Sequence, residues 1–199
     1  MKRSLLLLAI VLMTSLGASA QLFKKKSSEI EPAYAKGEVP VVNAKVTFEK
    51  RIPADGLTIG QVEERMNAWL AERFVEPTVI SAKRFESEKP HTAIVKGEEY
   101  IVFKSTFFVL SRARMYYYLT LTAEDGACTF NLTRITYWYD DEDEKGGIKM
   151  IAEDWITDDN AFNKKGELKK FEGKFRRKTI DLKEQLIKEL TEALNSTEK

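Results

Sequence analysis

The sequence has very little cysteine and histidine, with one residue of each among its 199 residues. The single cysteine, Cys128, cannot form an internal disulfide bond, and we expect it to be a small buried apolar residue. Structural zinc sites usually need four cysteine or histidine ligands, which this chain does not have. The single histidine, His91, follows a proline, and no Gly-x-Ser-x-Gly motif accompanies it. The sequence therefore predicts no catalytic residues, no metal site and no cofactor.

The chain also lacks an excess of charge of either sign. It contains 32 Lys and Arg residues against 31 Asp and Glu residues, which gives a formal net charge of +1. Because nucleic-acid-binding domains usually carry a basic face, this balance predicts no nucleic-acid partner. Hydrophobic residues make up 43% of the chain, enough for the core of a soluble domain.

Long hydrophobic runs are missing as well. The longest is Leu5–Met13, about half of the roughly 20 residues that span a bilayer. Two basic residues precede this run, and the small residues Ala18 and Ala20 follow it. This pattern predicts that residues 1–20 are a signal peptide cut after Ala20. We therefore expect a periplasmic or secreted protein with no transmembrane span after cleavage.

The segment after the predicted cut has little periodicity. Residues 21–40 contain three consecutive lysines, a proline and a glycine, and we interpret them as a flexible tether. Residues 41–195 are expected to form a single domain. Its first element is a strand over residues 42–49, because Val42, Ala44, Val46 and Phe48 alternate with polar residues.

An amphipathic helix is predicted to begin after Thr58. Gln61 lies three residues beyond Thr58, which is the spacing of a capping box. The apolar stripe of this helix consists of Ile59, Val62, Met66, Trp69, Leu70 and Phe74, and Pro77 ends the pattern.

A period of two then predicts a set of antiparallel strands. These strands cover residues 79–85, 115–123 and 127–139, with one or two more over 92–95 and 100–110, on either side of Lys96-Gly97-Glu98. Asp125-Gly126 favours a tight hairpin turn. A β-bulge near Arg134 is expected because the alternation of apolar residues changes phase there.

The last third of the chain is less regular. We expect an irregular insertion over residues 140–175 that includes an acidic loop, Asp140–Glu144, and a short helical piece over 148–155. A final helix is predicted from Thr179 to Leu194, because leucines recur every four residues. The basic cluster 174–178 then lies just before that helix. The order of elements predicts an α+β fold in which two helices cover one face of an antiparallel sheet of about five strands.

The uncovered face of this sheet is the candidate binding surface. Tyr116 and Tyr118 alternate with Tyr117, so they face the opposite side from the core residues Leu119 and Leu121. The predicted binding residues are Tyr100, Tyr116 and Tyr118, with Arg112 and Arg114 as rim charges. The alternative is that these tyrosines only reflect the preference of aromatic residues for strands.

Carboxylates are the other abundant reactive groups. The loop Asp140–Glu144, followed by Asp154, Asp158 and Asp159, does not match an EF-hand, although an irregular calcium loop remains an alternative to a solvated one. Two of these acids would suffice for glycoside hydrolysis, but nothing in the sequence sets the distance between them.

Several stretches resemble a known family. They are Val46-Thr47-Phe48-Glu49-Lys50, the helix containing Trp69, Ala93-Ile94-Val95-Lys96-Gly97, Tyr117-Tyr118-Leu119-Thr120-Leu121 with its Asp-Gly turn, and Phe175-Arg176-Arg177-Lys178-Thr179-Ile180-Asp181. The chain resembles the domain of unknown function with a TBP-like fold found in secreted proteins of Bacteroides-type bacteria. The resemblance implies a curved antiparallel sheet backed by two helices, in the order β-α-β-β-β-β-α, and supplies no catalytic residues.

The leading hypothesis is therefore a non-enzymatic periplasmic or secreted binding module whose open sheet face meets an envelope protein, a peptide or a glycan. The alternative is a carboxylate-dependent glycan hydrolase. A homo-oligomer formed through the same face is a third possibility.

Overall fold

The computed structural model describes residues 30–75, 79–106, 110–139 and 146–196. The predicted signal peptide with its cut site and the acidic loop Asp140–Glu144 lie outside these ranges. The predicted α+β class is confirmed, since an antiparallel sheet is combined with two long helices. None of the helices in the described ranges is long and apolar enough to cross a membrane.

Within these ranges the sheet has seven strands, all paired in antiparallel fashion. Their order is β1-β2-β6-β5-β4-β3, and β7 extends the sheet beside β6. The strands are β1 (Val41–Val42), β2 (Lys45–Pro53), β3 (Val79–Phe85), β4 (Thr92–Ser105), β5 (Leu110–Glu124), β6 (Ala127–Tyr139) and β7 (Ile148–Ile151). β2 and β7 pair with successive halves of β6, so β6 has a different neighbour at each end.

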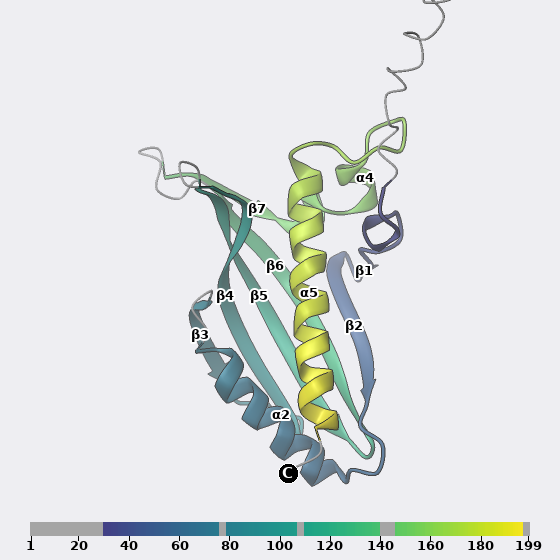
Figure 1. Cartoon of the computed structure of the whole chain (residues 1–199), viewed down its shortest axis with the longest axis vertical. Helices are drawn as coiled ribbons and strands as arrows, with labels where there is room; N and C mark the ends of the chain where they lie inside the picture. Colours follow the sequence, from purple (N-terminus) through teal and green to yellow (C-terminus); the bar gives the residue numbers. More distant parts are fainter. Residues whose placement is uncertain (1–29, 76–78, 107–109, 140–145, 197–199) are drawn as a thin grey trace, which may run out of the picture.

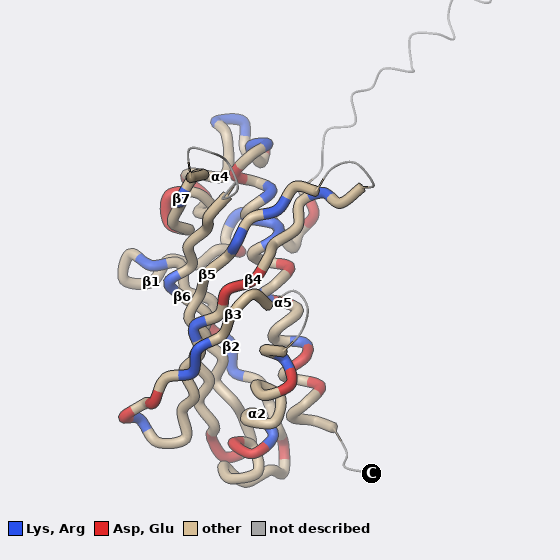
Figure 2. Tube along the Cα trace, turned by 90° about the vertical axis from the view of Figure 1, so that its left-hand side faces the viewer, with Lys and Arg blue, Asp and Glu red and all other residues tan. Residues whose placement is uncertain are grey.

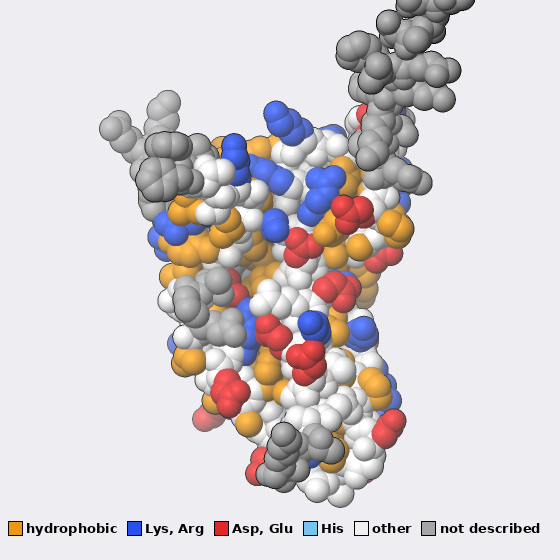
Figure 3. All heavy atoms as spheres, in the orientation of Figure 1, with side chains coloured by type: hydrophobic (Ala, Val, Ile, Leu, Met, Phe, Trp, Pro, Cys, Tyr) orange, Lys and Arg blue, Asp and Glu red, His pale blue; other side chains and the backbone are white. Residues whose placement is uncertain are grey.

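The helices lie on one side of this sheet. Figures 1 and 2 show α2 (Ile59–Arg73) and α5 (Glu172–Asn195) packed against the same face. The short elements η1 (Pro32–Tyr34), α3 (Ala152–Trp155) and α4 (Asp158–Ala161) contact α5 and therefore belong to the same layer. Viewed from this side, basic side chains gather near the start of α5 and acidic ones lie closer to its end (Figure 3).

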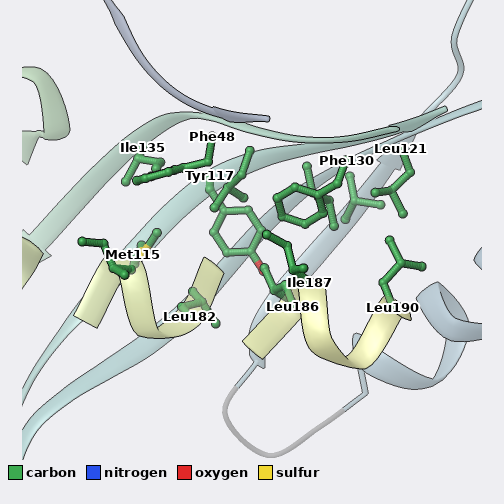
Figure 4. Close-up of a cluster of buried hydrophobic side chains, with 14 of the residues drawn as sticks. Phe48, Met115, Tyr117, Leu121, Phe130, Ile135, Leu182, Leu186, Ile187 and Leu190 are labelled. Atoms are coloured by element: carbon green, nitrogen blue, oxygen red, sulfur yellow. The ribbon is translucent and has the colours of Figure 1, made fainter. Parts of the chain in front are cut away.

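The core fills the space between the sheet and the two long helices. Met115, Tyr117, Leu119 and Leu121 alternate along β5 and are all fully buried. Figure 4 shows Tyr117 in this layer, close to residues of α5 such as Leu186 and Ile187. Cys128 is a free, buried cysteine as predicted, and burial raises its pKa to about 12. The thiol therefore stays protonated and acts as an apolar side chain.

The start of α2 agrees with the sequence prediction. The Thr58 hydroxyl accepts a hydrogen bond from the Gln61 backbone N–H at 3.4 Å, and the Gln61 side chain accepts one from Thr58 N–H at 2.9 Å. Both bonds satisfy backbone donors that a helix start leaves unpaired, which fixes where this helix begins.

The first predicted strand is wrong in its first half. Asn43 and Ala44 have φ angles of 50° and 60°, so the chain turns there and separates β1 from β2. Positive φ at two consecutive residues is the geometry of a tight hairpin turn. As a result Val42 is 51% exposed and does not join Val46 and Phe48 in the core.

Residues 30–40, predicted to belong to a tether, instead pack against α5. Arg176 is fully buried, and its guanidinium donates to the carbonyl oxygens of Tyr34, Ala35 and Ile156. The Tyr34 hydroxyl donates to Asp181 at 2.7 Å, which raises the pKa of Tyr34 to about 12. A buried arginine requires such acceptors, so this segment is part of the domain.

The last helix begins earlier than predicted. α5 starts at Glu172, so the basic cluster 174–178 forms its first turns and Thr179 is a buried helical residue. The Thr179 hydroxyl is 2.6 Å from the hydroxyl of Tyr137 on the sheet. Lys174 Nζ lies within 4.4 Å of the ring centroids of Phe103, Tyr139 and Phe171. These contacts hold Lys174 and Thr179 in the packed part of the domain. The sequence did not indicate this, because a run of basic residues is usually solvated.

Two further predictions concern shorter segments. Residues 148–155 were expected to be helical, but β7 occupies the first four of them and α3 the rest. Of the one or two strands expected on either side of Lys96-Gly97-Glu98 the structure has one, because β4 is continuous from Thr92 to Ser105. Gly97 is required by packing, since a Cβ atom there would lie 2.5 Å from the ring of Tyr117. The predicted insertion 140–175 thus contributes a strand and helical turns.

Candidate binding face

The five predicted binding residues lie on the same face of the sheet, the face away from α2 and α5. Tyr100 on β4 is directly opposite Arg114 on β5, and Arg112, Tyr116 and Tyr118 alternate with buried residues along β5. All five side chains are half-buried. The structure therefore brings together the residues that the alternation of the sequence had selected.

The two arginines lie among the aromatic rings of this face. The Arg112 guanidinium is 3.8 Å from the centroid of the Tyr100 ring, close enough for a stacked cation–π contact. Arg114 lies 5.3 Å from the ring of Trp138 and donates to Glu98 at 3.2 Å. Both were predicted as rim charges, but these contacts place them within the layer of rings.

The β-bulge expected near Arg134 is present. Tyr116 pairs with Thr136 and Tyr118 pairs with Thr133, so β6 has one more residue than β5 across this interval. Arg134 has a φ of 53°, a conformation that a bulge residue can adopt and a regular strand residue does not. The extra residue restores the burial of Ile135 and Tyr137 on the helix side.

A groove of about 590 Å³ opens beside this bulge on the uncovered face. We call it the bulge groove. Its lining includes residues of β4, β5, β6 and β7, namely Lys96, Tyr116, Tyr118, Arg134, Thr136, Trp138, Lys149 and Ile151. Its volume is in the range of sites for small ligands.

Among the described residues, the charged side chains that line the bulge groove are of one sign. Lys96, Arg134 and Lys149 line it, and no Asp or Glu of the described ranges does. Within the described ranges, these three cations form no ion pair. Arg134 lies 5.3 Å from the Tyr118 ring centroid and Lys149 lies 5.0 Å from that of Trp138. The groove thus combines aromatic surface with three cationic groups.

Glu98 lies on the same face of β4 as Lys96, and its carboxylate is bound by neighbouring side chains. Ser81 donates to Glu98 at 2.8 Å, in addition to the bond from Arg114. Burial and a hydrogen bond to Glu98 raise the pKa of Tyr116. Tyr116 is therefore a protonated hydrogen-bond donor at neutral pH, and Glu98 is paired with Arg114, which does not line the groove.

Six of the eight groove residues named above were not among the predicted binding residues: Lys96, Arg134, Thr136, Trp138, Lys149 and Ile151. For Trp138 the sequence did contain a signal: the change of phase at the bulge places Trp138 on the same face of the sheet as Tyr116. Lys149 gave no signal, since residues 148–151 were predicted to be helical.

The opposite face of the same strands contains a buried charged network. Arg73 of α2 and Glu99 of β4 are 3% and 2% exposed, and their side chains are joined at 2.7 Å. The Tyr117 hydroxyl donates to Glu99, and Glu189 of α5 lies 2.9 Å from Arg73. Burial and the charge of Glu99 raise the pKa of Tyr117 well above 10.0. This network links both long helices to the sheet.

The predicted acidic candidates do not converge in the described part of the chain. Asp158 is bound to Arg176 at 2.9 Å and accepts from Gly37 N–H at 2.7 Å, whereas Asp154 and Asp159 are exposed. His91 lies 2.7 Å from Glu63 at the surface. No group of three or more metal-ligating side chains occurs among the described residues. The acids 140–144 lie outside them.

Comparison with known proteins identifies relatives by sequence and by fold. Residues 48–138 match the family described as a domain of unknown function (DUF4468) with TBP-like fold. The crystal structure of a DUF4468 family protein from Bacteroides ovatus is 32% identical and superposes with a TM-score of 0.73, covering 82% of this chain and 94% of that one. A TBP-like protein from Parabacteroides distasonis, 18% identical, has a TM-score of 0.63 over 80% of this chain and 99% of that one.

No curated protein matches the chain. The matched interval 48–138 runs from β2 to β6 and contains α2, the bulge and most of the open face. The order of elements, the open antiparallel sheet and the identity to the Bacteroides ovatus protein agree with one another. The chain belongs to the DUF4468 family and has its TBP-like fold.

Proposed function

We propose that this protein is an exported, non-enzymatic binding module that uses the open face of its sheet. The observation that carries the proposal is the contrast between the two faces. All helices in the described ranges lie on one side, and the other side presents Tyr100, Tyr116, Tyr118 and Trp138 among arginine and lysine side chains. Aromatic and arginine side chains are the residues most enriched at binding interfaces.

The rings on the open face are less enclosed than those of the core. Tyr117 is enclosed by two helices, whereas Tyr116 and Tyr118 are only half-buried. The signal peptide predicted from residues 1–20 supports a partner in the periplasm or outside the cell. An envelope protein, a peptide or a glycan would fit that location.

The proposal is tested by removing the two tyrosines without disturbing the strand. Tyr116→Thr combined with Tyr118→Thr removes both rings and leaves residues that suit a strand. Wild-type protein immobilised on beads and crosslinked to the envelope fraction of the producing bacterium should retain a defined partner, and the double variant should lose it.

The matched control is Thr120→Ser combined with Thr122→Ser, further along the same face of β5. It should retain the same partner as the wild type. If the folded double tyrosine variant captures an unchanged set of partners, the open face is not the binding surface.

A further inference from the structure

The charge and the shape of the bulge groove indicate which class of ligand it can bind. It is built from four strands, and each of three of them contributes one cation: Lys96 from β4, Arg134 from β6 and Lys149 from β7. A ligand that pairs with all three cations must therefore carry several anionic groups that are separated from one another.

The cations surround side chains that are both apolar and hydroxylated. Tyr116 and Tyr118 present ring surface and phenolic hydroxyls, and Thr136 adds a hydroxyl in the groove. Such mixed surfaces suit a ligand that has apolar C–H faces and many hydroxyl groups. A sugar ring has both, and a uronic acid adds the carboxylate.

The ring contacts argue against nucleobases as the ligand. Single-stranded nucleic acids bind by stacking bases on aromatic faces. Here Arg134 lies over the Tyr118 ring and Lys149 over the Trp138 ring, and Phe85 stacks on Tyr118 with a centroid distance of 6.1 Å. These faces already have partners, while the cationic groups themselves remain directed at the groove.

The position of the groove argues against an extended peptide. Peptides that add to a sheet pair with the backbone of an edge strand. The groove instead lies over the inner strands β5 and β6, where only Arg134 and Ile135 of β6 fall between the stretches paired with β2 and with β7, too short a gap for a peptide strand to add. Recognition in the groove must therefore depend on side chains.

We propose that the bulge groove binds an acidic oligosaccharide, whose uronic-acid carboxylates pair with Lys96, Arg134 and Lys149 and whose hydroxyl groups form hydrogen bonds with the hydroxyls of Tyr116, Tyr118 and Thr136. This inference rests on the proposed function, since it names the ligand class of the same face. Carboxylates pair with lysine and, in a bidentate manner, with arginine, so the charge pattern favours a polyuronate over a neutral glycan.

The test uses tetragalacturonate and its methyl ester, which differ only in the charge of the carboxyl groups. Isothermal titration calorimetry with the full chain at low salt should show binding of tetragalacturonate and at least tenfold weaker binding of the ester. Added salt should weaken the binding of tetragalacturonate, because salt screens exposed charge pairs. Equal binding of acid and ester would overturn the inference.

A triple variant, Lys96→Gln, Arg134→Gln and Lys149→Gln, removes the three cations. It should weaken binding about tenfold or more, the combined effect expected of three solvent-facing ion pairs. The matched control is Lys50→Gln, Lys164→Gln and Lys165→Gln, which removes three exposed cations away from the groove and should leave binding unchanged. If the control variant loses as much affinity as the triple variant, the loss is explained by net charge alone. That result would overturn the assignment of the binding site to the groove.

Hexaglutamate and a short oligothymidylate serve as the competing ligand classes. Tighter binding of either one than of tetragalacturonate overturns the inference in favour of an acidic peptide or a single-stranded nucleic acid. If the wild type binds no tetragalacturonate but still captures an envelope partner through Tyr116 and Tyr118, the inference fails and the proposed function stands. If neither binding is seen, both fail.

Discussion

Tyr117 and its two neighbours on β5 have the same side chain and opposite environments. Tyr117 is fully buried, lies across Gly97 and donates to the carboxylate of Glu99. Tyr116 and Tyr118 are half-buried on the open face and contact Glu98, Phe85 and Arg134. Because successive strand residues face opposite sides, one step along the chain separates a residue that stabilises the domain from one available to a ligand.

The comparison suggests that changes on the helix side should alter stability, and changes on the open side should alter binding. The largest effect is expected at the buried ion pair. Arg73→Leu should lower the free energy of unfolding by about 3–5 kcal/mol, because Glu99 then remains charged in the core without its partner. Urea denaturation followed by circular dichroism measures this change.

Two further variants sharpen that first experiment. Arg73→Leu combined with Glu99→Leu should recover much of the lost stability, because no unpaired charge is left. Arg177→Leu removes an exposed arginine from α5 and should change stability by less than about 0.5 kcal/mol. A single Arg73 variant as stable as the wild type would show that the network does not support the core.

The next effect concerns the close packing of Gly97 and Tyr117. Gly97→Ala should destabilise the protein by about 1–3 kcal/mol, since the added methyl group would overlap the tyrosine ring. Tyr117→Leu removes the overlapping atoms, so Gly97→Ala should cost much less in that background. Thermal melts of the two single variants and the double variant give the coupling, and additive effects would contradict the packing argument.

Alkaline pH should also distinguish the two faces. Burial raises the pKa of Tyr117 and Tyr137 above the ordinary value of 10.0, so both keep their protons in the folded state after the unfolded chain has lost them. Stability is therefore fully present below about pH 10 and falls above it, by up to about 1.4 kcal/mol per pH unit for each such tyrosine. Urea midpoints measured from pH 8 to 11 should fall less steeply for Tyr117→Phe than for the wild type. If the urea midpoint falls equally steeply with pH in the wild type and in Tyr117→Phe, Tyr117 does not have a raised pKa in the folded state.

The smallest effect on stability is expected from the open face. Tyr116→Thr and Tyr118→Thr should each cost about 1 kcal/mol or less, which is the scale of cross-strand pairs on a half-exposed surface. Their melting temperatures should therefore stay close to that of the wild type while binding is lost. A loss of stability as large as that of Arg73→Leu would show that these tyrosines belong to the core.

The sequence predicted the fold class, the start of α2 and the bulge because each depends on a local pattern. Thr58 and Gln61 have the spacing of a capping box, and the phase of apolar residues changes at Arg134. It did not predict the early start of α5, since Arg176 is buried among carbonyl groups that belong to residues far away in the chain. Burial of a charged residue depends on tertiary partners, which no local pattern reveals.

The binding face was predicted in part for the same reason. Tyr100, Arg112, Arg114, Tyr116 and Tyr118 follow from the alternation along β4 and β5. Lys149 comes to the same surface only because β7 pairs with the second half of β6, a long-range contact within a segment that was expected to be helical. Its role in ligand binding, like that of the tyrosines, is a prediction for the experiments above.

The single extra residue at Arg134 also restricts how the length of this chain can change. Deleting it would reverse the orientation of everything that follows in β6: Tyr137 would point to solvent, and Trp138 would point into the core. Substitutions along the open face leave this orientation intact, whereas a change of one residue in length between Leu132 and Tyr137 does not. New ligand preferences in such a sheet are therefore expected to arise by exchanging side chains, with the number of residues in this strand kept constant.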